Sequence, residues 1–76
     1  MFPKNLTRLR EREKMTQTEL ARRINVTRGA IYMYERGTRQ PSVGIIEALM
    51  QLFGCTADEL LFGEGTAEET KGSETQ

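Results

Sequence analysis

The sequence contains no histidine and a single cysteine, Cys55, among its 76 residues. Catalytic triads and metal sites that depend on histidine are therefore excluded, and so is a zinc site built from paired cysteines. A glycine-rich phosphate loop that ends in Gly-Lys-Ser or Gly-Lys-Thr is also absent. These absences predict a protein that is not an enzyme and that uses no metal ion or other cofactor.

Long apolar runs are missing as well. No stretch approaches the roughly 20 apolar residues that span a bilayer, and the first residues lack the pattern of a secretory signal. One cysteine cannot form a disulfide within the chain, which fits a reducing compartment. A hydrophobic fraction of 37% and a charged fraction of 29% are ordinary for a small soluble domain. We expect a cytoplasmic protein that contacts no membrane.

The net charge of zero conceals two unlike segments. Residues 64–76 contain four glutamates and one lysine, a net charge of −3, whereas residues 1–63 carry ten Lys or Arg and seven Asp or Glu, a net charge of +3. The acidic segment is rich in Gly, Thr, Glu and Ser and cannot bury apolar area. We therefore predict a folded domain over 1–63 and a disordered acidic tail over 64–76.

The most informative pattern lies in residues 16–37. Thr16 and Glu19 fit a capping box, a hydroxyl residue followed three positions later by a carboxylate, and this starts a helix at Gln17. Apolar residues then follow at helical spacing. Asn25 tolerates the left-handed backbone conformation, so the chain is expected to reverse direction there.

A second helix is predicted over 28–36, with Thr27 as its N-cap and Gly37 as its C-cap. Advancing by about 100° per residue places apolar residues on one side of this helix; they are Ala30, Ile31 and Tyr34. The opposite side carries Arg28, Gly29, Tyr32, Met33 and Arg36. Two short helices joined by a tight turn form a helix-turn-helix, whose second helix fits the major groove of DNA.

Three further helices complete the prediction. One covers 4–13, one begins after the Ser42 cap and ends at Gly54, and one follows the capping-box pair of Thr56 and Glu59. The second of them carries a broad apolar band and is expected to be central to the core; the band comprises Ile45, Ile46, Leu49, Met50, Leu52 and Phe53. The predicted fold class is all-α with five helices.

Residues spread over 5–62 match the pattern of a known family. They are Leu9 and Arg10, the run from Thr16 to Ala21, Val26 and Thr27, Ile31, the run from Glu35 to Gly37, Pro41 and Ser42, and Leu60 and Leu61. In this combination the chain resembles the Cro/cI-type helix-turn-helix family, also called lambda-repressor-like or Xre. The resemblance implies a compact five-helix domain whose third helix reads DNA. The chain departs from the family at Asn25, where glycine is frequent, and at Gly29 inside the reading helix.

Site residues follow from the outward face and from the resemblance. Base reading is expected from Arg28, Gly29, Tyr32 and Met33. Phosphate contacts are expected at helix N-termini and in the loop after the reading helix, from Gln17, Thr18, Thr27, Arg36, Arg39 and Gln40. The resemblance also implies a structural ion pair between Arg10 and Glu35. Two alternatives stay open: Arg28 could hold a phosphate instead of a guanine, and Tyr32 with Met33 could contact the core or another protein.

The resemblance implies a sequence-specific DNA-binding transcriptional regulator, with repression as the commoner family role. So small a domain makes few base contacts, so we expect a homodimer on double-stranded DNA, with palindromic half-sites about 34 Å apart. The candidate dimer surface comprises Leu60, Leu61 and Phe62, and packing in the core explains these residues at least as well. The alternative is an antitoxin-type or DNA-binding head module that also binds a partner protein. The chain length favours a stand-alone regulator from a bacterium or phage, associated with the nucleoid.

Overall fold

The computed structural model describes residues 1–63, which form five α-helices. They are α1 (Phe2–Arg12), α2 (Gln17–Arg23), α3 (Arg28–Arg36), α4 (Val43–Phe53) and α5 (Ala57–Phe62). No β-strand occurs within this part of the chain, so the all-α prediction is confirmed. Spanning a bilayer would need a longer and more apolar helix than any found in residues 1–63. The predicted tail over 64–76 lies outside the described residues.

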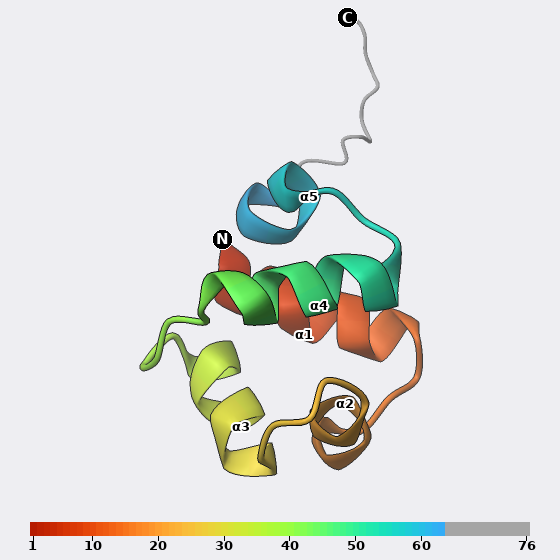
Figure 1. Cartoon of the computed structure of the whole chain (residues 1–76). Coiled ribbons are helices and arrows are strands. Elements are labelled where there is room, and N and C mark those ends of the chain that lie inside the picture. The colour runs from red at the N-terminus through yellow and green to blue at the C-terminus, as the bar shows by residue number, and fades with distance from the viewer. Residues whose placement is uncertain (64–76) are drawn as a thin grey trace, which may run out of the picture.

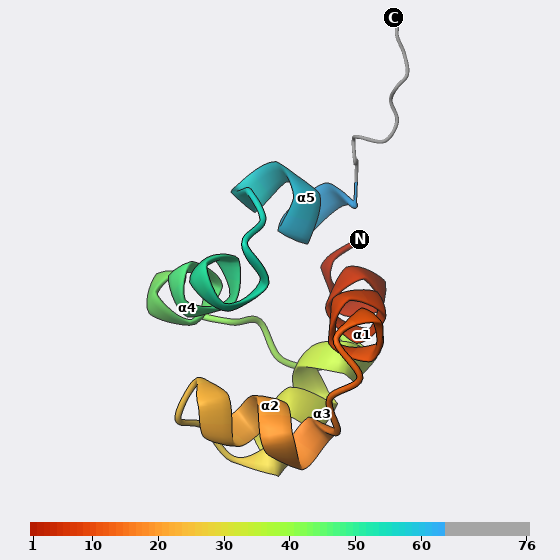
Figure 2. The same ribbon diagram turned by 90° about the vertical axis from the view of Figure 1, so that its right-hand side faces the viewer.

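The helices are arranged so that α2 and α3 lie at one end of the molecule and α5 lies at the other (Figures 1 and 2). Between these ends, α1 packs against both α3 and α5. The N-terminus lies beside α5 (Figure 2), and Pro3 in the first turn of α1 lies close to Gly37 at the C-terminal end of α3.

The core contains one fully buried aliphatic side chain from each helix. They are Leu6, Leu20, Ile31, Leu49 and Leu60, all at 0% exposure. Burying a side chain of this size contributes roughly 1.5–3 kcal/mol. These five side chains belong to one core cluster. The position of α3 is therefore fixed by the packing of Ile31 within that cluster.

The first helix begins earlier than the sequence predicts. We expected it over 4–13, whereas α1 runs from Phe2 to Arg12. Pro3 lies in its first turn, where the missing N–H needs no partner and the fixed φ already suits a helix. At the other end, Lys14 adopts the left-handed conformation at φ +59° and turns the chain toward α2.

The broad apolar band of α4 is less central than predicted. Only Leu49 and Phe53 are buried in this helix. The other members of the band, Ile45, Ile46, Met50 and Leu52, are half-buried and pack around the rim of the core. A band this wide exceeds the single face that neighbouring helices can cover in a five-helix domain. The central position belongs instead to α1, which contacts helices at both ends of the molecule.

The capping predictions for the last two helices are confirmed. The Ser42 hydroxyl accepts a hydrogen bond from the Ile45 amide at 3.2 Å. The Thr56 hydroxyl accepts from the Glu59 amide at 3.1 Å, and the Glu59 carboxylate accepts from the Thr56 amide at 2.8 Å, which completes a capping box. Gly54 ends α4 at φ +65°.

One buried polar residue, Asn5, was not singled out from the sequence. It is 6% exposed, and its Nδ2 donates to the Leu60 carbonyl at 3.1 Å. This bond satisfies a buried amide. It also joins α1 to α5, through two residues that are 55 positions apart in the sequence. A Cβ at Gly63 would collide with the Asn5 amide, so the end of α5 can approach α1 this closely only with glycine there.

Candidate nucleic-acid interface

The helix-turn-helix begins with the cap of α2. The Thr16 hydroxyl accepts a hydrogen bond from the Glu19 amide at 3.0 Å, as predicted. The Glu19 carboxylate does not complete the capping box but accepts from Arg23 Nη2 at 3.5 Å, one turn later. Asn25 adopts the left-handed conformation at φ +62°, which confirms its predicted place in the turn.

The turn holds α3 close to α2. The Val26 amide donates to the Ala21 carbonyl at 2.9 Å, and Ala21 is only 3% exposed. The Thr27 hydroxyl then accepts from the Ala30 amide at 3.1 Å and caps α3. Gly37 ends the helix at φ +78°. Both predicted caps of this helix are confirmed, and they fix the direction in which α3 leaves the turn.

The two faces of α3 differ in burial as the periodicity predicts. Its inner face is buried, with Ala30, Ile31 and Tyr34 at 5%, 0% and 3% exposure. Most of its outer face is exposed, namely Arg28, Gly29, Tyr32 and Arg36, while Met33 is half-buried. The outer face therefore presents basic, aromatic and bare backbone groups to solvent from a helix that is held rigidly on its other side.

Gly29 has no structural requirement in the folded domain. A Cβ at this position would meet only the Thr27 hydroxyl, at an ordinary contact distance of 3.9 Å. Glycine inside a helix costs roughly 1 kcal/mol relative to alanine. The packing of the folded domain therefore gives no reason for glycine at this position.

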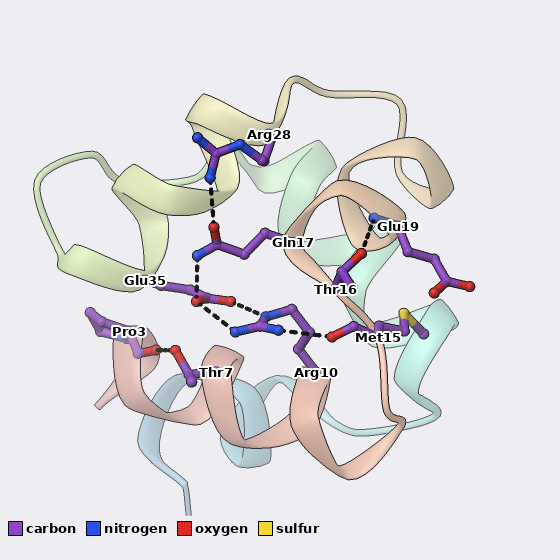
Figure 3. A network of polar contacts seen from close by, with 9 residues as sticks. All are labelled: Pro3, Thr7, Arg10, Met15, Thr16, Gln17, Glu19, Arg28 and Glu35. Atoms are coloured by element: carbon purple, nitrogen blue, oxygen red, sulfur yellow. Dashed lines mark hydrogen bonds and ion pairs between the residues drawn. The ribbon is translucent and has the colours of Figure 1, made fainter.

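A largely buried ion pair joins the end of α3 to α1 (Figure 3). Arg10 Nε and Nη2 donate to the two carboxylate oxygens of Glu35 at 2.7 and 3.2 Å, and Arg10 Nη1 donates to the Met15 carbonyl at 2.8 Å. The two side chains are 13% and 8% exposed. Hydrogen bonding to Glu35 raises the pKa of the Arg10 guanidinium above its ordinary value. The structure thus brings together the pair that the family resemblance implied.

Gln17 extends this network to the start of α3. Its Nε2 donates to Glu35 Oε1 at 3.0 Å, and its Oε1 accepts from Arg28 Nη1 at 3.0 Å. In Figure 3 the Gln17 amide lies between the two residues. The sequence assigned Gln17 to phosphate binding and missed this bridge, because its partners are 18 and 11 positions away. No local pattern reports such contacts.

Both arginines in the predicted phosphate-binding set lie over aromatic rings. The Arg36 guanidinium is 5.7 Å from the centre of the Tyr32 ring, and the Arg39 guanidinium is 5.8 Å from that of Tyr34. Both separations fall within the range of a cation–π interaction. Arg36 and Tyr32 consequently form one exposed unit on the outer face of α3, while Arg39 follows the C-terminal end of the helix.

The remaining predicted contacts are placed as follows. Thr18 is exposed in the first turn of α2, and Gln40 is exposed in the loop between α3 and α4. The Thr27 hydroxyl already accepts a hydrogen bond as the cap of α3. Within residues 1–63, no group of three His, Cys, Asp or Glu side chains is arranged to hold a metal ion.

The chain matches a known family model over most of its length. Residues 6–60 match the model described as helix-turn-helix. The chain is 34% identical over 64 residues to the uncharacterized HTH-type transcriptional regulator YqaE of Bacillus subtilis, covering 84% of this chain and 55% of that protein. It is 36% identical over 63 residues to the HTH-type transcriptional activator BcrR of Enterococcus faecalis, covering 83% and 31%.

A third relative is the antitoxin PezA of Streptococcus pneumoniae, 36% identical over 53 residues, covering 70% of this chain and 34% of that protein. The chain thus spans about half or less of the length of these relatives. Among solved structures, the DNA-binding domain of the P22 C2 repressor is 26% identical, with a TM-score of 0.77 and 84% of each chain covered.

The matches agree with the predicted fold and with the predicted family. The structural neighbour is a lambda-repressor-like domain, as the five-helix prediction required. The chain matches a helix-turn-helix family model, and two of these relatives are HTH-type transcriptional regulators, so the prediction that the chain is not an enzyme is confirmed. The chain therefore belongs to the helix-turn-helix family, in its Cro/cI-type branch.

Proposed function

We propose that the protein is a sequence-specific DNA-binding transcriptional regulator that places α3 in the major groove. The observation that carries the proposal is the outer face of α3, which is exposed, basic and aromatic while its inner face is buried. A helix fits the major groove of B-DNA, where each base pair offers a distinct set of donors and acceptors. The family membership supports the same conclusion.

In this proposal the outer face divides into two kinds of contact. Arg28, Tyr32 and Met33 read base edges, and Gly29 lets the backbone of α3 approach the groove. Phosphates are held by the first turn of α2 and by the loop after α3, through Gln17, Thr18, Thr27, Arg36, Arg39 and Gln40. Phosphate contacts fix the register of the protein on the duplex, and base contacts supply the preference for sequence.

The substitution Gly29→Ala tests the proposed close approach. We expect the free energy of unfolding to stay the same or to rise by up to about 1 kcal/mol, because the added methyl group meets no obstacle and alanine favours a helix. Binding to a preferred duplex should weaken by about tenfold or more, because the methyl group then stands between backbone and base. Urea unfolding and fluorescence anisotropy measure the two effects. Unchanged DNA affinity would show that Gly29 lies away from the interface.

We further propose that two copies bind a palindromic operator. One domain of this size reads few base pairs, and a dimer doubles the number of contacts with bases. The surface proposed for pairing lies at the end of α5, where Phe62 is 60% exposed and Met1 is 78% exposed. Leu60, predicted as part of this surface, is instead fully buried in the core. Both exposed residues line a groove of about 480 Å³ together with Phe2, Pro3, Ile46 and Leu61. Arg39 and Gln40 of the proposed phosphate-binding loop also line it, so the two proposed surfaces adjoin. In this proposal the groove is filled by the same surface of a second copy.

The substitution Phe62→Glu tests this dimer surface. A charge in an apolar contact should raise the dissociation constant of the dimer by about tenfold or more. Sedimentation velocity, alone and with a palindromic duplex, gives the stoichiometry. Val43→Glu is the matched control, since Val43 is 75% exposed and does not line the groove. Equal effects of the two substitutions, or a wild-type monomer both alone and on DNA, would remove the proposed dimer.

The proposal as a whole is tested by selection from a random pool of DNA duplexes at moderate salt. A sequence-specific dimer should enrich a palindrome whose half-sites are about 34 Å apart. The motif would identify the operator, and a reporter gene placed behind it would show whether binding represses, as we propose, or activates. A pool without enrichment, combined with binding that disappears as salt rises, would mean phosphate attraction alone and would contradict sequence-specific regulation.

A second candidate function is an antitoxin-type or DNA-binding head module. It is favoured by the match to the antitoxin PezA and by the greater length of the relatives. In this case a partner protein or a further domain would carry part of the activity. Purification of the native gene product from its own cells, followed by mass measurement, tests the alternative. A stoichiometric partner or a larger product supports it, whereas a product of this size alone supports a stand-alone regulator near the nucleoid.

A further inference from the structure

We propose that the solvent side of α1 is a binding surface for the acidic segment over 64–76 of the same chain. The surface consists of Lys4 and Arg8, with Arg12 one further turn along, and all three side chains are exposed. Its occupant begins directly after Gly63 and carries a net charge of −3. The inference goes beyond the proposed DNA-binding function, because it concerns a part of α1 that faces away from α3.

These basic groups lie on the side of α1 that points away from the core. Advancing by about 100° per residue places Lys4 opposite Leu6, which is fully buried. In the same way Arg8 lies opposite Arg10, whose guanidinium donates to Glu35 at the end of α3. The surface is therefore on the far side of α1 from the helix proposed to enter DNA.

Two of these cations have no counter-charge in the described part of the chain. Lys4 and Arg8 form no ion pair there, although like charges four positions apart weaken a helix. Arg12 is different, since it pairs with Glu13 at 3.1 Å. Glu11 lies three positions after Arg8 on the same side but does not pair with it. The uncompensated positive charge is thus concentrated in the first two turns of α1.

The acidic segment begins beside this charge. The Asn5 amide oxygen lies 3.5 Å from Arg8 Nη2, and a Cβ at Gly63 would collide with the same amide. Figure 2 shows the end of α5 next to the first turn of α1. Glu64 is the next residue, and consecutive Cα atoms are about 3.8 Å apart. The first glutamate of the segment therefore follows a residue that already lies close to Arg8.

The segment is long enough to follow α1. An extended chain covers about 3.3 Å per residue, so the residues 64–69 reach up to about 20 Å. The distance along α1 from Lys4 to Arg12 is about 12 Å, at 1.5 Å per residue. Three of the four glutamates of the segment fall within this reach; they are Glu64, Glu68 and Glu69. Because the segment is tethered at Gly63, its effective concentration at the surface is high.

Salt should control the contact. Each contact between exposed charges is weak, and it is screened by ions. The screening length is about 30 Å at an ionic strength of about 0.01 M and about 3 Å at about 1 M. We therefore expect the segment to bind α1 at the lower ionic strength and to leave it at the higher one.

The experiment compares backbone amide signals of the full chain by nuclear magnetic resonance at these two ionic strengths. In one variant all four glutamates of the segment are changed to glutamine, namely Glu64→Gln, Glu68→Gln, Glu69→Gln and Glu74→Gln. Arg8→Gln is then introduced into this variant and into wild type. Arg22→Gln is the matched control, because Arg22 is also an exposed helical arginine without an ion pair in the described part of the chain. Thermal unfolding checks that each variant is folded.

At the lower ionic strength, the four-glutamine variant should differ from wild type in the amide signals of α1 from Lys4 to Arg12. These differences should disappear at about 1 M salt. In the Arg8→Gln background most of them should be lost, because the segment no longer has its nearest cation. In the Arg22→Gln background they should remain unchanged. The differences should also be independent of protein concentration, since the contact lies within one chain.

Four results would overturn the inference. Signals that change mainly at Arg39 and its loop would place the segment at the proposed phosphate-binding surface instead. Differences that grow with protein concentration would mean that the segment binds a second copy. Equal effects of Arg8→Gln and Arg22→Gln would mean a general effect of net charge, and no differences at the lower ionic strength would leave the basic groups to another partner. None of these results concerns α3, so the proposed function would stand in each case.

Discussion

Glu35→Ala is expected to lower the free energy of unfolding by about 3 kcal/mol, the lower part of the range for breaking a buried ion pair. The substitution leaves the Arg10 guanidinium, 13% exposed, without its carboxylate partner. It also removes the acceptor that holds the Gln17 amide. Small domains are commonly stable by only about 5 kcal/mol, so this loss is a large fraction of the total. Urea unfolding followed by circular dichroism measures it.

Glu19→Ala is the control for this substitution. Glu19 pairs with Arg23 at 3.5 Å on the surface, with side-chain exposures of 37% and 52%. An exposed pair one helical turn apart contributes about 0.3–0.5 kcal/mol. Removing both partners of the buried pair, as in Arg10→Met with Glu35→Leu, should cost less than Glu35→Ala alone, since no charge is left buried. Similar small losses for Glu35→Ala and Glu19→Ala would contradict a structural role for the buried pair.

Ile31→Ala is expected to lower the free energy of unfolding by about 3–4 kcal/mol. Ile31 is fully buried and is the contribution of α3 to the set of five core side chains. Removal of its outer atoms leaves a cavity in the core, beside α1 and α2, against which α3 packs. DNA binding should weaken at temperatures where the domain begins to unfold. Urea unfolding and anisotropy at two temperatures give both quantities.

Tyr32→Ala is the matched comparison, one residue along the same helix. Tyr32 is 46% exposed on the opposite face, so its loss should change the free energy of unfolding by no more than about 0.5 kcal/mol. Instead it should reduce discrimination between DNA sequences, because an aromatic surface for base contact is lost. If Tyr32→Ala destabilised the domain as much as Ile31→Ala, or weakened all duplexes equally, the assigned faces of α3 would be wrong.

The helix-turn-helix could be predicted because its signals are local. Thr16, Thr27 and Gly37 act through the backbone of their own helix, and Asn25 acts through its own φ angle. Each such signal operates within a few residues. The start of α1 was predicted two residues late, because Pro3 was not recognised as a first-turn residue.

What depends on packing was harder to predict. The apolar band of α4 is visible in the sequence, but its width does not say which members the other helices will cover. Met15, at 9% exposure, joins the core from a loop that offers no periodicity. The outer face of α3 followed from helical phase alone. The bridge from Gln17 to Glu35 and Arg28 did not, because it requires three segments to be placed relative to one another.

The most direct test of the central claim is to map the DNA-bound surface by nuclear magnetic resonance. Backbone amide signals of the labelled protein would be followed as the selected duplex is added. The proposed interface predicts that the largest shifts fall in the first turn of α2, along α3, and in the loop at Arg39 and Gln40. Shifts concentrated on α4, with α3 unchanged, would contradict recognition of DNA by α3.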